Sequence, residues 1–229
     1  MKTIGIIGGL TWLSTIDYYR LLNQIGNQRC GGNEYPNIIV YSVNFGEFKV
    51  LTETQRWNDI AILLSGIAKK LQDAGADCLL IGANTMHRVA DEVQQAITIP
   101  VIHIAEETAK VIAAQKLKKL ALLGTRYTMV FDFFRNKLAL QGIDSMIPGE
   151  KDIGYINNAI YTEMGKGLFL PETKSGFLEI IDGLVLQGAE GIILGCTEIP
   201  ILIKAEDCRV PVFDTTLIHA QAAIEFALG

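Results

Sequence analysis

Two short segments of this chain resemble each other, and they carry the side chains best suited to proton transfer. Residues 75–85 read GADCLLIGANT and residues 188–198 read GAEGIILGCTE, so a shift of 113 positions superposes them. The superposition places Ala83 opposite Cys196, each just after an apolar run. A thiol can act as an acid and its thiolate as a base. One copy therefore holds a candidate acid/base, and the other holds a methyl group at the same place.

Cys196 is the strongest single candidate for catalysis. It follows a predicted strand and precedes a short predicted helix, where backbone N–H groups and the helix dipole are expected to lower the pKa of a thiol. Glu198 could orient that thiol or accept a substrate ammonium group, although a glutamate in a first helical turn is also ordinary. The remaining cysteines are interpreted as small core hydrophobes. They are Cys30, Cys78 and Cys208.

Short neutral side chains flank the two strand ends and suggest a binding site for a carboxylate. Asn84, Thr85 and Thr197 can each donate a hydrogen bond without carrying charge. Helix capping is the alternative interpretation, because Asn and Thr cap helices routinely. Occurrence in both copies favours a functional role. No two of the 3 histidines have metal-ligand spacing, so no metal site is expected.

The elements that must position these residues follow from the hydrophobic pattern. Short apolar runs alternate with longer amphipathic stretches, which predicts βαβ units, a parallel sheet and an α/β fold. Residues 53–74 form the clearest predicted helix, ending at Gly75. The predicted strands are Thr3–Ile7, Asn37–Val43, Cys78–Ile81, Val101–His103, Lys119–Leu123, Gly191–Leu194 and Val212–Phe213.

Two further matches indicate that the chain is a duplication. Residues 4–8 align with 120–124, and residues 99–103 align with 210–214, in the same order and at nearly the same offset. We therefore expect two pseudo-symmetric lobes, each a parallel sheet flanked by helices, with the active site in the cleft between them. The predicted lobes are residues 1–100 plus about 215–229, and residues 101–214. Shared strand–helix architecture without duplication is the alternative.

Composition restricts the partners. The chain has 229 residues, a net charge of −5 and no basic cluster, which argues against nucleic acid and favours a small-molecule substrate. No uncharged apolar run approaches the roughly 18–20 residues of a membrane helix. The first loop, IIGGLTWLST, lacks both common nucleotide-binding glycine motifs. Four cysteines without CxxC pairing are expected to be reduced thiols of a cytoplasmic protein.

Four motifs stand out along the chain: Gly8-Gly9-Leu10-Thr11-Trp12, Asn84-Thr85-Met86-His87, Leu123-Gly124-Thr125-Arg126-Tyr127-Thr128 and Gly195-Cys196-Thr197-Glu198. Together they resemble the cofactor-independent aspartate/glutamate racemase family, and the likeness covers essentially the whole chain. Glutamate racemases proper carry Asp-Ser-Gly in the first loop and histidine after the second Cys-Thr. This chain has Gly-Gly-Leu and Glu198 there, so it looks like the aspartate racemase or broad amino-acid racemase branch.

The resemblance implies an isomerase in which two opposed cysteines remove and return the α-proton of an amino acid, without pyridoxal phosphate or any other cofactor. Cys196 then corresponds to one catalytic thiol. Lys166 corresponds to a lysine that reaches an acidic side chain of the substrate, such as aspartate or glutamate. A homodimer is also implied. The residues expected to bind substrate are Leu10, Asn84, Thr85, Lys166, Thr197 and Glu198.

Position 83 departs from the family pattern, because Ala83 stands where the first catalytic cysteine is expected. Alanine cannot carry a proton, and loss of a positioned acid/base costs about 10²–10⁴ in rate. Thr85, His87 or a bound water could substitute, and the alanine could be natural or engineered. Two other functions stay open: a one-cysteine decarboxylase or isomerase of the same superfamily, and a catalytically silent binder of acidic amino acids.

Overall fold

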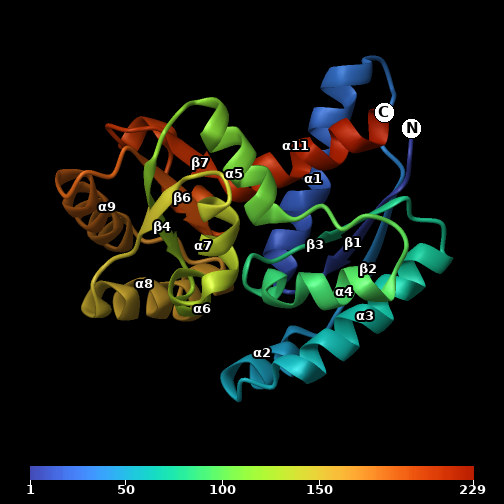
Figure 1. The fold of residues 1–229 in the computed structure, drawn as a ribbon, viewed down its shortest axis with the longest axis horizontal. Coiled ribbons are helices and arrows are strands. Elements are labelled where there is room, and N and C mark those ends of the chain that lie inside the picture. Colours follow the sequence, from blue (N-terminus) through green and yellow to red (C-terminus); the bar gives the residue numbers. More distant parts are fainter. The chain divides into compact units, whose positions relative to one another are not determined.

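The computed structural model describes residues 1–229, and its chain divides into two compact units. The first unit comprises Met1–His103 and His219–Gly229, and the second comprises Ile104–Ile218. Each unit is a parallel sheet flanked by helices (Figure 1), so the predicted α/β fold with two parallel sheets is confirmed.

The first unit has a three-stranded parallel sheet in the order β2-β1-β3. An isolated parallel bridge from Leu79 to Val101 adds a fourth segment beside β3. In Figure 1, α1 and α11 lie on one side of this sheet, and α3 and α4 lie on the other. The elements are β1 (Ile4–Gly8), α1 (Trp12–Cys30), β2 (Ile38–Ser42), α2 (Phe45–Glu53), α3 (Trp57–Asp73), β3 (Cys78–Ile81), η1 (Thr85–Val89), α4 (Ala90–Ala96) and most of α11 (Thr215–Leu228).

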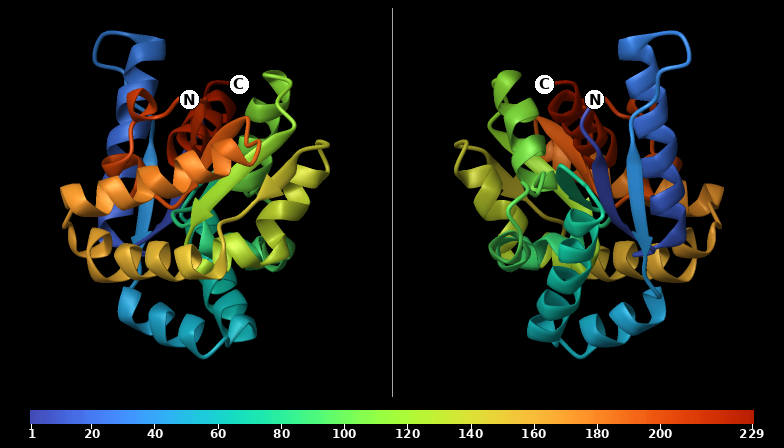
Figure 2. Two further views of the ribbon diagram at one scale, coloured as in Figure 1. Left: turned by 90° about the vertical axis from the view of Figure 1, so that its left-hand side faces the viewer. Right: turned by 90° about the vertical axis from the view of Figure 1, so that its right-hand side faces the viewer.

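The second unit has a four-stranded parallel sheet in the order β5-β4-β6-β7. Figure 2 shows α8 and α9 in front of this sheet in its left-hand view. The elements are α5 (Ile104–Ala114), β4 (Lys119–Gly124), α6 (Arg126–Val130), α7 (Asp132–Ala139), β5 (Asp144–Met146), α8 (Glu150–Thr162), η2 (Met164–Lys166), α9 (Pro171–Leu186), β6 (Gly191–Gly195), α10 (Ile199–Leu202), η3 (Ala205–Asp207) and β7 (Val212–Asp214).

The two sheets have the same topology. β2, β1, β3 and the Val101 bridge follow one another across the first sheet, as β5, β4, β6 and β7 do across the second. Leu79 pairs with Val101 in the first unit, and Ile192 pairs with Val212 in the second. Matching order, direction and register in both units agree with the duplication that the sequence suggests.

Apolar side chains on alternate strand residues build the cores. Along β4, Ala121 and Leu123 pack with α8 and α9, whereas Leu120 and Leu122 pack with α5 and α7. Strands covered on both faces read as continuous hydrophobic runs, because neither face meets water. This pattern explains why β1, β3, β4 and β6 could be located from the sequence, with bounds that shift by at most one residue at either end.

Three sequence interpretations need correction. The helix expected over residues 53–74 begins at Trp57, because α2 ends at Glu53 and Gln55 has a φ of 54°. Residues 101–103 contribute only the Val101 bridge instead of a strand. Cys30 is exposed at the end of α1, so it is not a core hydrophobe, whereas Cys78 is buried. The sequence also gave no indication of β5, which is short and polar.

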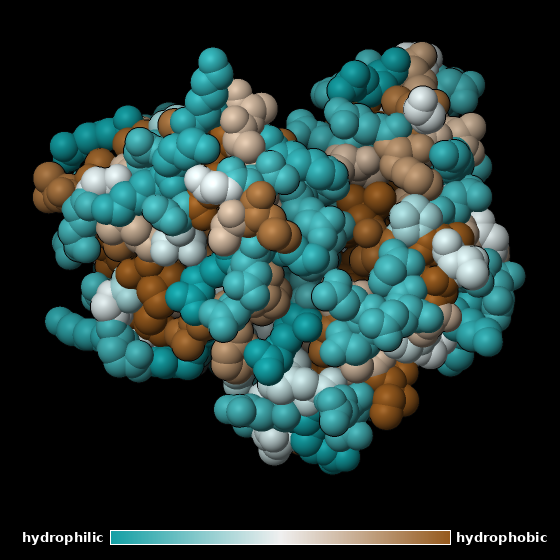
Figure 3. Space-filling view, in the orientation of Figure 1, coloured by the Kyte–Doolittle hydropathy of each residue, from teal (hydrophilic) through white to brown (hydrophobic).

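The face shown in Figure 3 carries mostly hydrophilic side chains, with hydrophobic patches between them. Among all helices, none combines the length and the apolar character needed to cross a membrane. The most exposed large hydrophobic side chains are scattered over both units, among them Leu186 and Leu140 in the second and Ile62 in the first.

Candidate active site

The end of β6 is shaped by two glycines that face each other across the sheet. Gly124 of β4 and Gly195 of β6 are register partners. A Cβ atom on Gly124 would lie 2.6 Å from the carbonyl oxygen of Gly195, and one on Gly195 would lie 2.9 Å from that of Leu123. No side chain fits there, so the two strand ends approach closely and the chain turns directly into Cys196.

Cys196, Thr197 and Glu198 form a hydrogen-bonded cluster at this strand end. The Cys196 thiol donates to Glu198 Oε2 over 3.0 Å, and the Thr197 hydroxyl donates to the same oxygen over 2.8 Å. All three residues are buried, with Glu198 only 3% exposed. The carboxylate therefore holds the thiol proton and orients the sulfur, as one of the interpretations of Glu198 anticipated.

The protonation of Cys196 differs from the sequence expectation. Burial raises the pKa of the Cys196 thiol well above its usual value, and the neighbouring Glu198 carboxylate raises it further. The backbone N–H groups of Thr197 and Glu198 do act to lower the pKa, as predicted, but they are outweighed. Cys196 is therefore a neutral thiol in this structure, ready to donate a proton rather than to accept one.

The corresponding strand end in the first unit carries Ala83. The N–H of Gly82 donates to the carbonyl of Ile7 over 2.9 Å, and the Ser14 hydroxyl donates to the carbonyl of Gly82 over 2.9 Å. His87 Nδ1 lies 2.9 Å from the carbonyl oxygen of Ala83. This strand end is thus fixed through its backbone, by a hydroxyl group from α1 and an imidazole from η1.

Asn84 and Thr85 are both buried beside Ala83. Asn84 is the residue before η1, and its side chain makes no capping hydrogen bond to that helix. The capping alternative considered for Asn84 is therefore wrong. Its role in substrate binding stays a prediction, as does that of Thr85.

The loop after β1 repeats in the second unit. Gly9 has a φ of 79°, where an added side chain would collide with the backbone of Val43, so a glycine is required. The Thr11 hydroxyl accepts from the N–H of Ser14 over 3.3 Å and caps α1. The Thr125 hydroxyl accepts from the N–H of Thr128 over 3.3 Å and caps α6.

Two predicted substrate-binding residues lie in different surroundings. The side chain of Leu10 is buried in the core of the first unit. Lys166 is exposed in η2 of the second unit, and its neighbour Met164 packs in the same core cluster as Cys196. The structure therefore brings Cys196, Thr197 and Glu198 into direct contact and leaves Lys166 in solvent.

Sequence reasoning missed a buried polar network in the first unit. The Tyr18 hydroxyl lies 2.7 Å from His219 Nδ1, and His219 Nε2 lies 2.7 Å from the carbonyl oxygen of Ile102. The His219 ring also lies 5.4 Å from that of His87, measured between centroids. Spacing gave no signal for this network, because its members are far apart in the chain.

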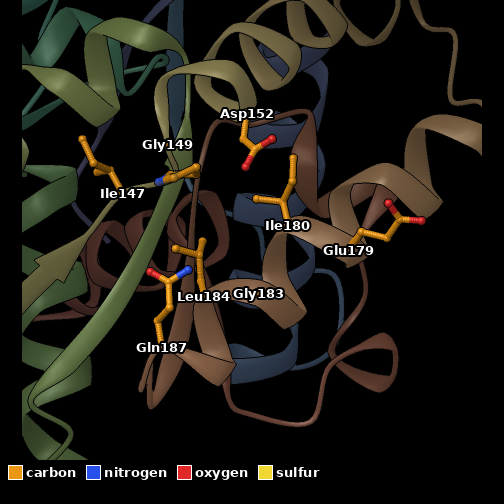
Figure 4. Close-up of a pocket in the computed structure, with 9 residues that line it drawn as sticks. Ile147, Gly149, Asp152, Glu179, Ile180, Gly183, Leu184 and Gln187 are labelled. Carbon is orange, nitrogen blue, oxygen red and sulfur yellow. The ribbon is translucent and has the colours of Figure 1, made fainter.

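Two surface cavities of the second unit are not lined by Cys196, Thr197 or Glu198. One, of about 380 Å³, lies beside β7 and α10, and the other, of about 230 Å³, lies between α8 and α9. Figure 4 shows the second of these, in which the Glu179 carboxylate points away from Asp152 and Gln187. Polar groups that do not converge give no orientation to a ligand, so this cavity is not a candidate site.

The structure thus defines an α/β protein of two units with matching sheets, in which a thiol and a carboxylate are paired at one of the two corresponding strand ends. Residues 7–223 match the Asp/Glu/Hydantoin racemase family, and the chain belongs to this family. It is therefore a member of a family of isomerases, and the resemblance inferred from the motifs is confirmed.

Individual relatives agree over their full lengths. A candidate Asp/Glu racemase from Yersinia pestis is 44% identical, with a TM-score of 0.93 and complete coverage of both chains. An aspartate racemase homologue from Pyrococcus horikoshii OT3 is 36% identical, with a TM-score of 0.87 and complete coverage of both. The broad specificity amino-acid racemase RacX of Bacillus subtilis (strain 168) is 25% identical over 99% of this chain and 98% of its own.

Proposed function

We propose that this protein is an amino-acid racemase for aspartate, glutamate or a related amino acid. It works without a cofactor, by removing the α-proton and returning one, and Cys196 is one of its acid/base groups. The observation that carries the proposal is the buried hydrogen-bonded cluster of Cys196, Thr197 and Glu198 in a chain of this family. Proton transfer at carbon needs a positioned acid/base group, and a thiol with a carboxylate partner can serve as one.

The raised pKa of Cys196 sets the order of events on its face of the substrate. As a neutral thiol, Cys196 can protonate a planar carbanion directly. To act as a base, it must first pass its proton to Glu198, whose Oε2 already accepts it over 3.0 Å. The resulting thiolate takes the α-proton and becomes a thiol again. When this thiol returns a proton to the carbanion, Glu198 gives its own proton back to the sulfur, which restores the starting state.

The carbanion that forms is stabilised by groups around the substrate carboxylate. Asn84, Thr85 and Thr197 are the proposed side-chain donors, with the backbone next to Leu10 as a further contact. Thr197 donates to Glu198 in this structure, so it must exchange that partner for the ligand. The exposed ammonium group of Lys166 supports an acidic substrate, because it is free to turn toward a side-chain carboxylate. A homodimer and a cytoplasmic location stay predictions from the sequence.

Ala83 restricts the activity that we expect to one face of the substrate. Inversion requires a second proton carrier on the opposite face of the carbanion, and Ala83 has none. We therefore expect racemisation to be slow or absent while proton exchange on the Cys196 face persists. The Nδ1–H of His87 is held by the carbonyl of Ala83, so only Nε2 of this ring could exchange a proton with a substrate.

Deuterium exchange tests the proposal. The protein is incubated in D₂O with L- or D-aspartate and with L- or D-glutamate, and α-deuteration and optical rotation are followed together. Exchange that is lost in Cys196→Ser supports the assignment of the thiol, and accompanying inversion identifies a racemase. If neither exchange nor inversion occurs although the amino acids bind, the chain is a binder of acidic amino acids and the enzyme proposal is wrong for these substrates.

A one-cysteine decarboxylase or isomerase is the second candidate function. Ala83 together with the neutral Cys196 thiol favours it, since a single acid is enough to protonate an enediolate from one face. An arylmalonate substrate distinguishes the two, because a decarboxylase releases CO₂ and forms one enantiomer. Release of CO₂ without exchange on aspartate or glutamate would favour this second function.

A further inference from the structure

All 3 histidines of the chain belong to the first unit and gather in one buried cluster. The ring centroids of His87 and His103 lie 4.9 Å apart, and those of His87 and His219 lie 5.4 Å apart. Their exposed fractions are 2%, 6% and 0% for His87, His103 and His219. His103 and His219 are the residues of the first unit at which the chain passes to and returns from the second unit. His87 thus packs against both of these connections.

The hydrogen bonds of His219 determine its tautomer. Its Nε2 lies 2.7 Å from the carbonyl oxygen of Ile102, which can only accept, so Nε2 carries the proton. Its Nδ1 then accepts from the Tyr18 hydroxyl over 2.7 Å. Burial, together with the neighbouring His87, lowers the pKa of His219 from 6.5 to about 3, so the ring is neutral near pH 7. Both nitrogens are engaged, and no group of His, Cys, Asp and Glu side chains is arranged to hold a metal ion.

The same reasoning applies to His87. Its Nδ1 lies 2.9 Å from the carbonyl oxygen of Ala83, so Nδ1 donates the hydrogen bond. This carbonyl belongs to the peptide that joins Ala83 to Asn84. The structure has no cis peptide bond, so the N–H of Asn84 points opposite to the Ala83 carbonyl. Fixing one end of this rigid unit with the imidazole therefore fixes the direction of the other.

We propose that His87 is a positioning residue, which holds the Ala83–Asn84 peptide so that the Asn84 N–H is directed at the substrate carboxylate. This inference rests on the proposed function for the role of that carboxylate. The imidazoles of His103 and His219 support the His87 ring from the two connections, and Ser14 holds the preceding peptide through the carbonyl of Gly82. A hydrogen bond from a side chain that is itself packed in place limits rotation of the peptide more than a bond from a mobile one.

Two substitutions separate positioning from packing. In His87→Asn the side-chain amide nitrogen occupies the place of Nδ1 and can still donate to Ala83. In His87→Gln the amide lies near the place of Nε2 and cannot. Calorimetric titration with L-aspartate and L-glutamate is expected to show a Kd within about threefold of wild type for His87→Asn, and roughly tenfold weaker binding for His87→Gln. Equal weakening in both variants would overturn the proposal, because loss of packing affects them alike.

Nuclear magnetic resonance provides a test that does not depend on any ligand. In wild-type protein labelled with ¹⁵N, His87 should be the Nδ1–H tautomer and His219 the Nε2–H tautomer, with His219 neutral near pH 7. The backbone amide resonance of Asn84 should move in His87→Gln and stay close to wild type in His87→Asn. An Nε2–H tautomer at His87, or an unmoved Asn84 amide in His87→Gln, would overturn the proposal. If wild-type protein binds no amino acid, the proposed function fails, and these spectra still decide whether His87 fixes the peptide.

Discussion

The two equivalent strand ends of this protein occupy the same place in their sheets, but their side chains differ in what they bond to. In the second unit the end of β6 presents a thiol, a hydroxyl and a carboxylate bonded to one another. In the first unit the end of β3 presents a methyl group, and the nearby imidazole of His87 bonds to the backbone. The second strand end therefore carries a proton that can be moved, and the first carries a fixed peptide.

This difference shows that two units with matching sheets can carry different chemical groups at the same strand end. The first unit keeps the parallel sheet, the capped helix after β1 and the buried Asn84 and Thr85. What it lacks is a proton carrier at position 83. The comparison predicts an enzyme, or the remnant of one, that acts on a single face of its substrate.

Restoring the missing thiol is expected to have the largest effect. Ala83→Cys supplies a proton carrier where the chain has a methyl group, and we expect the rate of racemisation of the preferred substrate to rise about 10²–10⁴-fold. Optical rotation and α-deuteration in D₂O measure this gain. Ala83→Ser is the matched control, because it is similar in size but too weak an acid to exchange protons in the same way. A folded Ala83→Cys variant without any gain in racemisation would mean that position 83 is not the functional counterpart of position 196.

We expect His219, in the first unit, to make the folded protein less stable at acidic pH. The pKa of His219 is lowered from 6.5 to about 3, so below pH 6.5 the unfolded chain binds a proton that the folded chain excludes. The stability from this group is complete above pH 6.5 and is lost as pH falls toward 3. In His219→Gln, which can still donate to Ile102, we expect the fall in unfolding free energy between pH 7 and pH 5 to shrink by about 2 kcal/mol.

Urea denaturation at the two pH values measures this effect. Tyr18→Phe is the control, because it removes the hydroxyl donor but leaves the titrating ring of His219 in place. It should keep the acid loss of the wild type. Equal pH dependence in wild type and His219→Gln would show that the imidazole cluster is not the source.

Removing the carboxylate of the second strand end should make its thiol more acidic. Glu198 raises the pKa of Cys196 through its charge and its hydrogen bond, so Glu198→Gln should let the thiolate form at lower pH. Ultraviolet absorbance of the thiolate during a pH titration measures the change. The titration is made in a Cys30→Ser background, because Cys30 is exposed. The pKa of Cys78 is raised to about 12, so that thiol does not interfere. An unchanged titration in Glu198→Gln would mean that burial alone controls Cys196.

The strand ends could be predicted from the sequence because their information is local. A short run of buried apolar residues followed by glycine marks β3 and β6, as expected where both faces of a sheet are covered. The pairing of Cys196 with Glu198 was one of two local interpretations, and the structure selects it. The protonation of Cys196 was predicted wrongly, because the N–H groups that lower a pKa are visible in the sequence and the depth of burial is not.

The supporting network could not be predicted, because it joins distant parts of the chain. Tyr18 and His219 are 201 positions apart, and His219 and Ile102 are 117 apart. No periodicity or motif links them, and the contacts exist only because α11 returns to the first unit. β5 was missed for a different reason: its residues are exposed or half-buried at the edge of the sheet, so they lack the apolar run that identifies the other strands.

The smallest effect concerns the feature that the two units share most closely. Thr11 and Thr125 each follow the first strand of their sheet, and each hydroxyl accepts from the N–H three residues later over 3.3 Å. Because each hydroxyl caps its helix over the same distance, Thr11→Ala and Thr125→Ala should each reduce the unfolding free energy by about 1 kcal/mol, although the Thr125 hydroxyl also lies 3.2 Å from that of Thr128. Thr11→Ser and Thr125→Ser, which keep the acceptor oxygen, should restore most of it. Urea denaturation monitored by circular dichroism checks both pairs. A loss in one unit only would mean that the symmetry of the scaffold is geometric and that its energetics have diverged, as the chemistry at positions 83 and 196 already has.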